Sequence, residues 1–237
     1  MTLRRSLALA VAALAVPMAL AACSTDPAAS LPPIPAATPT PIASAHPSGP
    51  AFTYPPECPT AQPDAFAATD VRIVTISTEK GDIVMEIKGE LSPIAAANFA
   101  KLAECGFYDG VVFHRVVTGF VIQGGDGQFG RAGNLIPGVI GTGGPPYKIK
   151  DEPVTTTYRR GTVAMARTAQ PDSVGSQFFI VLDDAAAKAL GDPAYNNYQI
   201  IGSVTSGMEA VDAIAAAADQ ENPTNPIVMT KVTVTTP

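Results

Sequence analysis

From residue 71 onward, short apolar runs rich in β-branched side chains are separated by turn-forming residues. Residues 71–77 and 82–88 have this pattern, and the segment 78–81, Thr-Glu-Lys-Gly, is typical of the turn that joins two strands of a hairpin. Further strands are expected at residues 111–122, 162–166, 178–182, 198–204 and 227–234. The pattern therefore predicts a domain built mainly from β-strands.

Two segments have the apolar spacing of helices. Residues 94–104 follow Ser92 and Pro93, which are expected as the N-cap and the first helical residue, and Gly106 lies just past the end. A second helix is expected at about residues 207–218. Many short strands with only two helices predict a closed antiparallel β-barrel and not a fold of alternating strands and helices.

The N-terminal part of the chain has a different pattern. Arg4 and Arg5 precede an apolar run over residues 7–22, which is short for a membrane span but has the length of the apolar region of a signal peptide. The run ends at residues 20–23, Leu-Ala-Ala-Cys, which resemble a bacterial lipobox. We therefore predict a signal peptide over residues 1–22 and lipidation of Cys23, which would anchor the protein to the cell membrane on its extracytoplasmic side. The alternative is an ordinary signal peptide with an incidental cysteine.

Residues 23–57 consist largely of Pro, Ala, Ser and Thr with hardly any charge. Such a segment cannot bury enough apolar surface to fold, and its prolines favour extended conformations. We predict a disordered tether over residues 23–57, followed by a folded domain over residues 58–237.

The net charge bears on the possible binding partners, and the cysteine content bears on disulfide formation. The chain carries a formal charge of −6, which argues against a nucleic-acid partner because phosphate binding needs a surface rich in Lys and Arg. Cys58 and Cys105 remain once Cys23 is assigned to the lipid. In an exported chain they either form a disulfide or stay as two buried thiols, and the sequence leaves both alternatives open.

Residues 113–126 place one permanent cation, Arg115, among aromatic and aliphatic side chains, with the amide of Gln123 eight positions later. An arginine beside an apolar pocket suits rotation about an X-Pro peptide bond, because this reaction needs a hydrogen-bond donor for the twisted amide and no nucleophile, cofactor or metal. Phe113, Phe120 and Val121 are the apolar residues of this segment that we expect around the proline ring, together with Phe179 from residues 176–180.

These two segments, 113–126 and 176–180, together resemble the cyclophilins, which are peptidyl-prolyl cis/trans isomerases. The resemblance runs from about residue 71 to the end of the chain. It implies an eight-stranded β-barrel capped by two helices and the binding of proline-containing peptide segments. The implied catalytic residues are Arg115 and Gln123, and the implied substrate-binding residues are Phe113, Phe120, Val121, Ala166, Arg167, Gln177, Phe179 and Tyr198.

The chain departs from the family pattern at several positions. Thr118 stands where proline is common, and Val121 stands where methionine is common, which implies a shallower pocket. An insertion lies between Gly127 and Gly141, within a loop rich in Gly and Pro. The chain has no Trp, so the resemblance implies weak binding of cyclosporin.

Other chemistries are less compatible with the sequence. A triad of Ser176, His114 and Asp126 lacks the strand-turn-helix nucleophile elbow. A zinc site is disfavoured because His46 and His114 are the only histidines and His46 falls in the tether. We expect His114 to be structural, since the isomerisation transfers no proton.

The sequence therefore predicts a monomeric, membrane-anchored peptidyl-prolyl isomerase that acts on exported proteins. Two alternatives stay open. The first is a non-catalytic module or holdase chaperone that binds proline-containing peptides, and the second is a structural surface lipoprotein.

Overall fold

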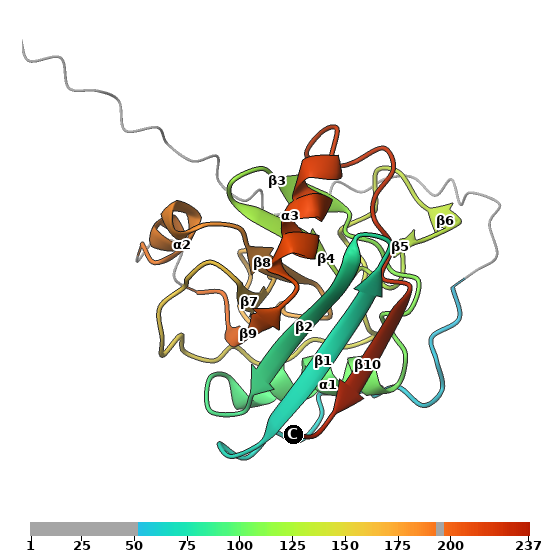
Figure 1. Ribbon diagram of the computed structural model, residues 1–237. Coiled ribbons are helices and arrows are strands. Elements are labelled where there is room, and N and C mark those ends of the chain that lie inside the picture. The colour runs from blue at the N-terminus through green and yellow to red at the C-terminus, as the bar shows by residue number, and fades with distance from the viewer. Residues whose placement is uncertain (1–51, 193–196) are drawn as a thin grey trace, which may run out of the picture. The chain divides into compact units, whose positions relative to one another are not determined.

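An antiparallel sheet of eight strands curls around the main hydrophobic core (Figure 1). The computed structural model describes residues 52–192 and 197–237. The strands of the sheet are β1 (Val71–Thr78), β2 (Gly81–Lys88), β3 (Arg115–Val117), β4 (Val121–Gly124), β7 (Thr162–Met165), β8 (Phe178–Val181), β9 (Ile200–Ser206) and β10 (Lys231–Thr235), in the order β10-β1-β2-β9-β7-β8-β4-β3. Two short strands, β5 (Gly130–Arg131) and β6 (Asn134–Leu135), form a separate hairpin.

The predicted first hairpin is confirmed. β1 and β2 pair over their whole length, from Val71 opposite Lys88 to Thr78 opposite Gly81. Gly81 has a φ of 116°, a conformation that favours glycine and lets the chain reverse tightly. Alternate residues of the two strands face the core, and they are Val74, Ile76, Ile83, Met85 and Ile87. This is the period-2 pattern of a sheet buried on one face.

The central strands β4, β7 and β8 are buried on both faces. In β8, Phe178 and Ile180 belong to the main core, whereas Phe179 and Val181 belong to a second apolar cluster on the other face of the sheet. We call this second set the outer apolar cluster; it comprises Phe120, Val121, Tyr158, Ala164, Phe179, Val181, Ala186, Ala187, Leu190, Tyr198 and Ile200. Burial on both faces explains why these strands are continuous apolar runs in the sequence.

In the described part of the chain, three helices pack on the sheet. α1 (Pro93–Glu104) and α3 (Met208–Ala217) contribute to the main core, and α2 (Asp184–Leu190) packs on the outer apolar cluster. In Figure 1, α1 lies toward the lower end of the curled sheet and α3 toward the upper end. The prediction of two helices was therefore incomplete. The missed helix α2 is short and follows its N-cap Asp183, whose carboxylate accepts a hydrogen bond of 2.7 Å from the Ala186 N–H.

The prediction of a closed barrel was wrong for the described residues. β3 and β10 are the two ends of the sheet and are not paired with each other. The gap is bridged locally by backbone hydrogen bonds between residues 110–116 and 221–229. Among them are one of 2.7 Å from the Val116 N–H to the Glu221 carbonyl and one of 2.9 Å from the Phe113 N–H to the Ile227 carbonyl. The segment between Glu221 and Val228 contains two prolines, which lack the N–H that a continuous ladder needs.

Two local predictions also change. The strand predicted at residues 111–122 is interrupted by a turn at Thr118 and Gly119, and Gly119 has a φ of 71°. The predicted N-cap Ser92 does precede α1, but its side chain makes no capping hydrogen bond. Instead, the Glu152 carboxylate accepts hydrogen bonds of 2.9 Å from the N–H groups of Ile94 and of the residue after it. A distant carboxylate thus stabilises the start of this helix.

The first described residues are attached to the domain. The rings of Phe52 and Tyr54 lie 6.3 and 5.9 Å from that of Phe107, and both lie before the predicted domain boundary at residue 58. Cys58 and Cys105 form a disulfide, which is one of the two alternatives that the sequence left open. The disulfide joins this segment to the end of α1.

The predicted signal peptide, the lipidation site Cys23 and the tether up to residue 51 lie outside the described residues. Among the residues that are described, no helix has both the length and the hydropathy needed to cross a lipid bilayer.

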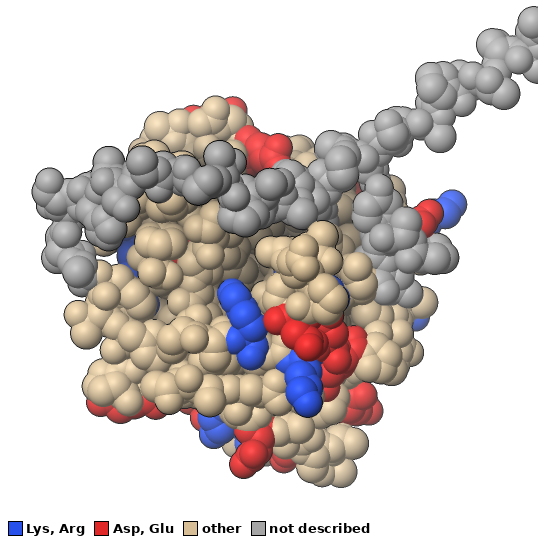
Figure 2. Space-filling model, turned by 180° about the vertical axis from the view of Figure 1, so that it is seen from behind, with Lys and Arg blue, Asp and Glu red and all other residues tan. Residues whose placement is uncertain are grey.

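Charged side chains are sparse on the face opposite to that of Figure 1. Figure 2 shows a small group of basic and acidic side chains that adjoin one another there, within a largely uncharged described surface.

We expect the disulfide to stabilise the domain, because it links residues 47 positions apart and so restricts the unfolded chain. Replacing both Cys58 and Cys105 by Ala should lower the free energy of unfolding by about 2–4 kcal/mol. Urea unfolding of the oxidised wild type and of the double variant measures the difference. An unchanged unfolding midpoint for the double variant would contradict the prediction.

Candidate active site

Arg115 and Gln123 lie opposite each other on the neighbouring strands β3 and β4. Nη1 of Arg115 lies 3.5 Å from Oε1 of Gln123, at the long end of hydrogen-bond distances. Nε of Arg115 donates a shorter hydrogen bond, of 2.7 Å, to the carboxylate of Glu221. The Arg115 side chain is 11% exposed, so two polar partners hold a guanidinium that is largely shielded from water.

A chain of amide groups continues from Gln123. Its Nε2 donates to Oε1 of Gln177 over 3.1 Å. Nε2 of Gln177 in turn donates to the backbone carbonyls of Gly141 and Gly143, at 2.8 and 3.0 Å. The catalytic candidate Arg115 is thereby connected through two glutamines to the glycine-rich loop.

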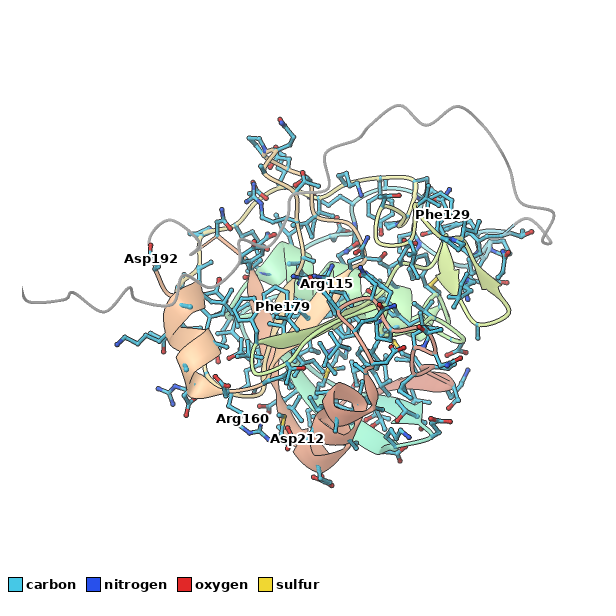
Figure 3. All side chains as sticks on the ribbon, turned by 90° about the horizontal axis from the view of Figure 1, so that it is seen from above. Arg115, Phe129, Arg160, Phe179, Asp192 and Asp212 are labelled. Atoms are coloured by element: carbon cyan, nitrogen blue, oxygen red, sulfur yellow. A yellow bond between two sulfur atoms is a disulfide. The ribbon has the colours of Figure 1, made fainter. Side chains whose placement is uncertain are left out.

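The outer apolar cluster lies beside this polar chain. Gln123 on β4 pairs with Arg115 on β3 and with Phe179 on β8, so only strand β4 lies between Arg115 and Phe179. Figure 3 shows both near the centre of the molecule. The Phe179 ring meets the Tyr198 ring edge to face, with centroids 5.4 Å apart, and Phe120 and Val121 belong to the same cluster. The structure thus places the cation of Arg115 and the outer apolar cluster on neighbouring strands.

Two predicted substrate-binding residues lie elsewhere. Phe113 is fully buried in the main core, where its ring centroid lies 6.2 Å from that of Phe178. Because residues 113 and 114 precede the regular part of β3, strand alternation does not direct Phe113 to the outer face. The Arg167 guanidinium pairs with Asp151 at 2.9 Å and donates to the Gln170 carbonyl, so it stabilises its own loop.

Ala166 retains a place at the site through its backbone. Its N–H donates a hydrogen bond of 2.8 Å to the Gln177 carbonyl, and its side chain packs on the outer apolar cluster. Ala166 therefore adjoins both the polar chain and the apolar surface.

Asp126, at the end of the first predicted motif, organises the glycine-rich loop. One carboxylate oxygen accepts the N–H groups of Gln128 and Phe129, at 3.1 and 2.9 Å. The other oxygen accepts those of Gly141 and Gly143, at 2.7 and 3.0 Å. The fully buried charge is thus compensated by four donors, and both ends of the insertion are fixed beside Gln177.

The conceivable Ser-His-Asp triad is not formed. The Ser176 hydroxyl donates to the Gly125 carbonyl at 2.7 Å, and the Asp126 carboxylate is occupied by backbone N–H groups. Both ring nitrogens of His114 are buried without a hydrogen-bond partner among the described residues. Its burial lowers the pKa of His114 from 6.5 to about 4, although the nearby Asp126 carboxylate opposes this change. His114 is therefore neutral at pH 7, in agreement with a structural role.

Sequence reasoning missed two residues at the site. Glu221 contacts Arg115 across a sequence separation of 106 residues, and no local pattern indicates this contact. Tyr158, in an irregular polar segment, donates a hydrogen bond of 2.8 Å to the Tyr198 carbonyl and joins the outer apolar cluster. An aromatic residue in a polar segment was the only signal available for Tyr158.

Comparison with known proteins identifies the class. The model of the family described as "Cyclophilin type peptidyl-prolyl cis-trans isomerase/CLD" matches residues 73–234. The chain therefore belongs to the cyclophilin-type family, and it is a peptidyl-prolyl cis-trans isomerase.

Among its relatives, a probable peptidyl-prolyl cis-trans isomerase of Brucella abortus is 39% identical over 160 residues, which are 67% of this chain and 79% of the relative. Peptidyl-prolyl cis-trans isomerase A of Dickeya dadantii is 35% identical over 176 residues, which are 72% of this chain and 88% of the relative.

A solved cyclophilin-type isomerase of Cryptosporidium parvum, crystallised in the presence of the dipeptide Ala-Pro, has a TM-score of 0.58 and 29% identity to this chain. The match covers 70% of this chain and 99% of that one.

The buried His114 predicts a pH dependence of stability. The unfolded chain binds the proton near pH 6.5, whereas the folded protein binds it only near pH 4, so stability is complete above pH 6.5 and falls as the pH decreases toward 4. We expect His114 to account for a loss of about 2–4 kcal/mol in the free energy of unfolding over this range.

Urea unfolding of the wild type, His114→Gln and the control His46→Gln between pH 7 and pH 4 measures this contribution. The His114 variant should have a flatter pH dependence than the other two proteins. Equal slopes for all three would contradict the prediction.

Proposed function

We propose that Arg115 catalyses the isomerisation by donating hydrogen bonds to the amide while it is twisted. The observation that carries the proposal is the position of its guanidinium, which Gln123 and Glu221 hold beside the outer apolar cluster. An arginine side chain has five N–H donors. No hydrogen bond from Arg115 other than these two occurs among the described residues, so donors on both terminal nitrogens remain for a substrate.

The chemistry needs such donors. Resonance gives the peptide bond a barrier of about 18–20 kcal/mol, and an X-Pro bond isomerises unaided in tens to hundreds of seconds. When the bond is twisted, resonance is lost and the nitrogen becomes a hydrogen-bond acceptor. A donor that is shielded from water and already oriented stabilises this state more than the planar ground state, and so lowers the barrier.

The outer apolar cluster would receive the proline ring at Phe120 and Tyr198, which are its least buried members at 7% and 8% exposed. Phe179 and Tyr198 pack edge to face, and Phe120 adjoins them in the cluster. Ala166 packs on this cluster, and the Gly141 and Gly143 carbonyls, which accept from Gln177, each keep a second lone pair for an N–H of an extended peptide. Arg115 and the cluster together favour catalysis over a non-catalytic module that only binds proline-containing peptides.

We also propose that the enzyme is lipid-anchored at Cys23 outside the cytoplasm and that its substrates are exported proteins. Two features support this proposal. Residues 20–23 have the pattern of a lipobox, and the Cys58–Cys105 disulfide is of a kind that persists mainly in oxidising compartments.

We expect Arg115→Ala to lower kcat/KM for an Ala-Pro peptide about 100- to 1000-fold, the effect of losing one transition-state donor in comparable sites. Arg115→Lys should be intermediate, because lysine keeps the charge but not the planar arrangement of donors. Arg159→Ala, which removes an exposed arginine, is the control and should be fully active. An NMR exchange experiment measures both binding and isomerisation.

Full activity of the Arg115→Ala variant would refute this mechanism. Peptide binding by the wild type without accelerated exchange would instead support the alternative of a holdase.

For the anchor, we expect Cys23→Ser to move the protein from the membrane fraction to a soluble fraction, since it removes the thiol that would carry the lipid. Fractionation of cells that produce the full chain, with a radiolabelled fatty acid, checks this. Retention of the label by the Cys23→Ser variant would contradict the proposal. The matched control is Ser24→Ala, which leaves the thiol in place.

A further inference from the structure

We propose that Glu221 is a positioning residue that orients the guanidinium of Arg115 for the twisted amide. The proposal rests on the catalytic role proposed above for Arg115. It adds a residue that lies far from the two sequence motifs, in the segment that follows α3.

The bond between the two side chains fixes the plane of the guanidinium. Oε1 of Glu221 accepts from Nε of Arg115 at 2.7 Å. Because the Nε–H bond lies in the plane of the guanidinium, an acceptor at this nitrogen restricts rotation of the whole group. The hydrogen bond to Glu221 uses neither terminal nitrogen of the guanidinium. Nη1 therefore reaches Gln123, and the other N–H groups of the two terminal nitrogens are free to face a substrate.

The backbone of Glu221 is also bound to the strand that carries Arg115. The Glu221 carbonyl accepts a hydrogen bond of 2.7 Å from the N–H of Val116, the residue that follows Arg115. The backbone and the side chain of Glu221 therefore both bind strand β3, and this keeps the carboxylate close to the arginine.

The segment around Glu221 is also braced internally. Thr224 donates its N–H to Asp219 at 3.0 Å, and Gln220 donates to the Thr224 hydroxyl at 3.4 Å. Further along, the Ile227 carbonyl accepts the N–H of Phe113 at 2.9 Å. These bonds give the loop a defined shape, so the fold sets the position from which the Glu221 side chain extends to Arg115.

The exposure of Glu221 distinguishes a positioning role from a role in stabilising the fold. The Glu221 side chain is 51% exposed, whereas that of Arg115 is 11% exposed. An ion pair with one such partner in water contributes little to folding. Without Glu221, however, the guanidinium would have to lose its rotational freedom in each catalytic cycle, which raises the barrier. A loss of rate with nearly unchanged stability is the expected signature.

The test compares Glu221→Ala, Glu221→Gln and the control Glu209→Ala, which removes the same charge from an exposed position on α3. With an Ala-Pro peptide, we expect Glu221→Ala to lower kcat about 3- to 10-fold while KM changes less than about twofold. Glu221→Gln keeps an acceptor oxygen and should recover at least about half of the wild-type kcat. Urea unfolding should show similar stability for all four proteins.

A spectroscopic measurement follows the orientation directly. The NMR signal of the Arg115 Nε–H, assigned with Arg115→Lys, should shift and exchange faster with water in Glu221→Ala, but remain in place in Glu209→Ala. In the Arg115→Lys background, Glu221→Ala should cause no further loss of kcat, because the oriented group is already absent.

Two results overturn the inference without affecting the proposed function. One is a normal or increased kcat of Glu221→Ala when Arg115→Ala is inactive. The other is that Glu221→Ala lowers kcat by the same factor in the Arg115→Lys background as in the wild type. If Arg115→Ala itself is fully active, the proposed function fails first, and the role of Glu221 fails with it.

Discussion

The burial of strands β4 and β8 on both faces is the constraint on which the site depends. The main core lies on one side of these strands and the outer apolar cluster on the other. Phe178 and Phe179 are adjacent in sequence, yet each faces a different cluster because side chains alternate along a strand. The core thereby fixes the backbone of β8, and the same backbone determines where the Phe179 ring lies relative to Arg115.

The polar side chains at this site form one continuous chain of hydrogen bonds. The hydrogen bonds run from Arg115 through Gln123 and Gln177 to the glycine-rich loop, whose ends are bound by Asp126. Arg115, Gln123 and Gln177 are half-buried, and each hydrogen bond of the chain restricts the side chains that it joins. The orientation of the guanidinium is therefore a property of the network, and the insertion between Gly127 and Gly141 is part of that network.

A second set of contacts holds the N-terminal end of the described chain. The Arg131 guanidinium lies 4.5 Å from the centroid of the Phe52 ring and donates hydrogen bonds to three backbone carbonyls. Burial lowers the pKa of Arg131, and the nearby Asp109 carboxylate opposes this change. These contacts join the segment that begins at Phe52 to the hairpin of β5 and β6, and the disulfide joins Cys58 to the end of α1. The insertion thus contacts both the start of the domain and the active site.

Most strands could be predicted from the sequence, because apolar alternation and turn residues are local signals. The hairpin of β1 and β2 and the opposite directions of Phe178 and Phe179 follow from such signals. The open edge between β3 and β10 could not be predicted in this way, because it depends on how distant segments meet. Phe113 shows the same limit, since its burial depends on the irregular backbone before β3 and not on its residue type.

The sequence by itself determined the reaction class and the central pair of the site. Arg115 and Gln123 are close along the chain, and a single tight hairpin brings them together. Only the tertiary structure decided what orients that pair. Glu221 reaches Arg115 from 106 residues away, and Arg167 turns to Asp151 instead of the pocket. The physical reason is that strand pairing acts between neighbours, whereas the choice of a partner for a charged side chain depends on which distant segments the packed core brings within hydrogen-bond distance.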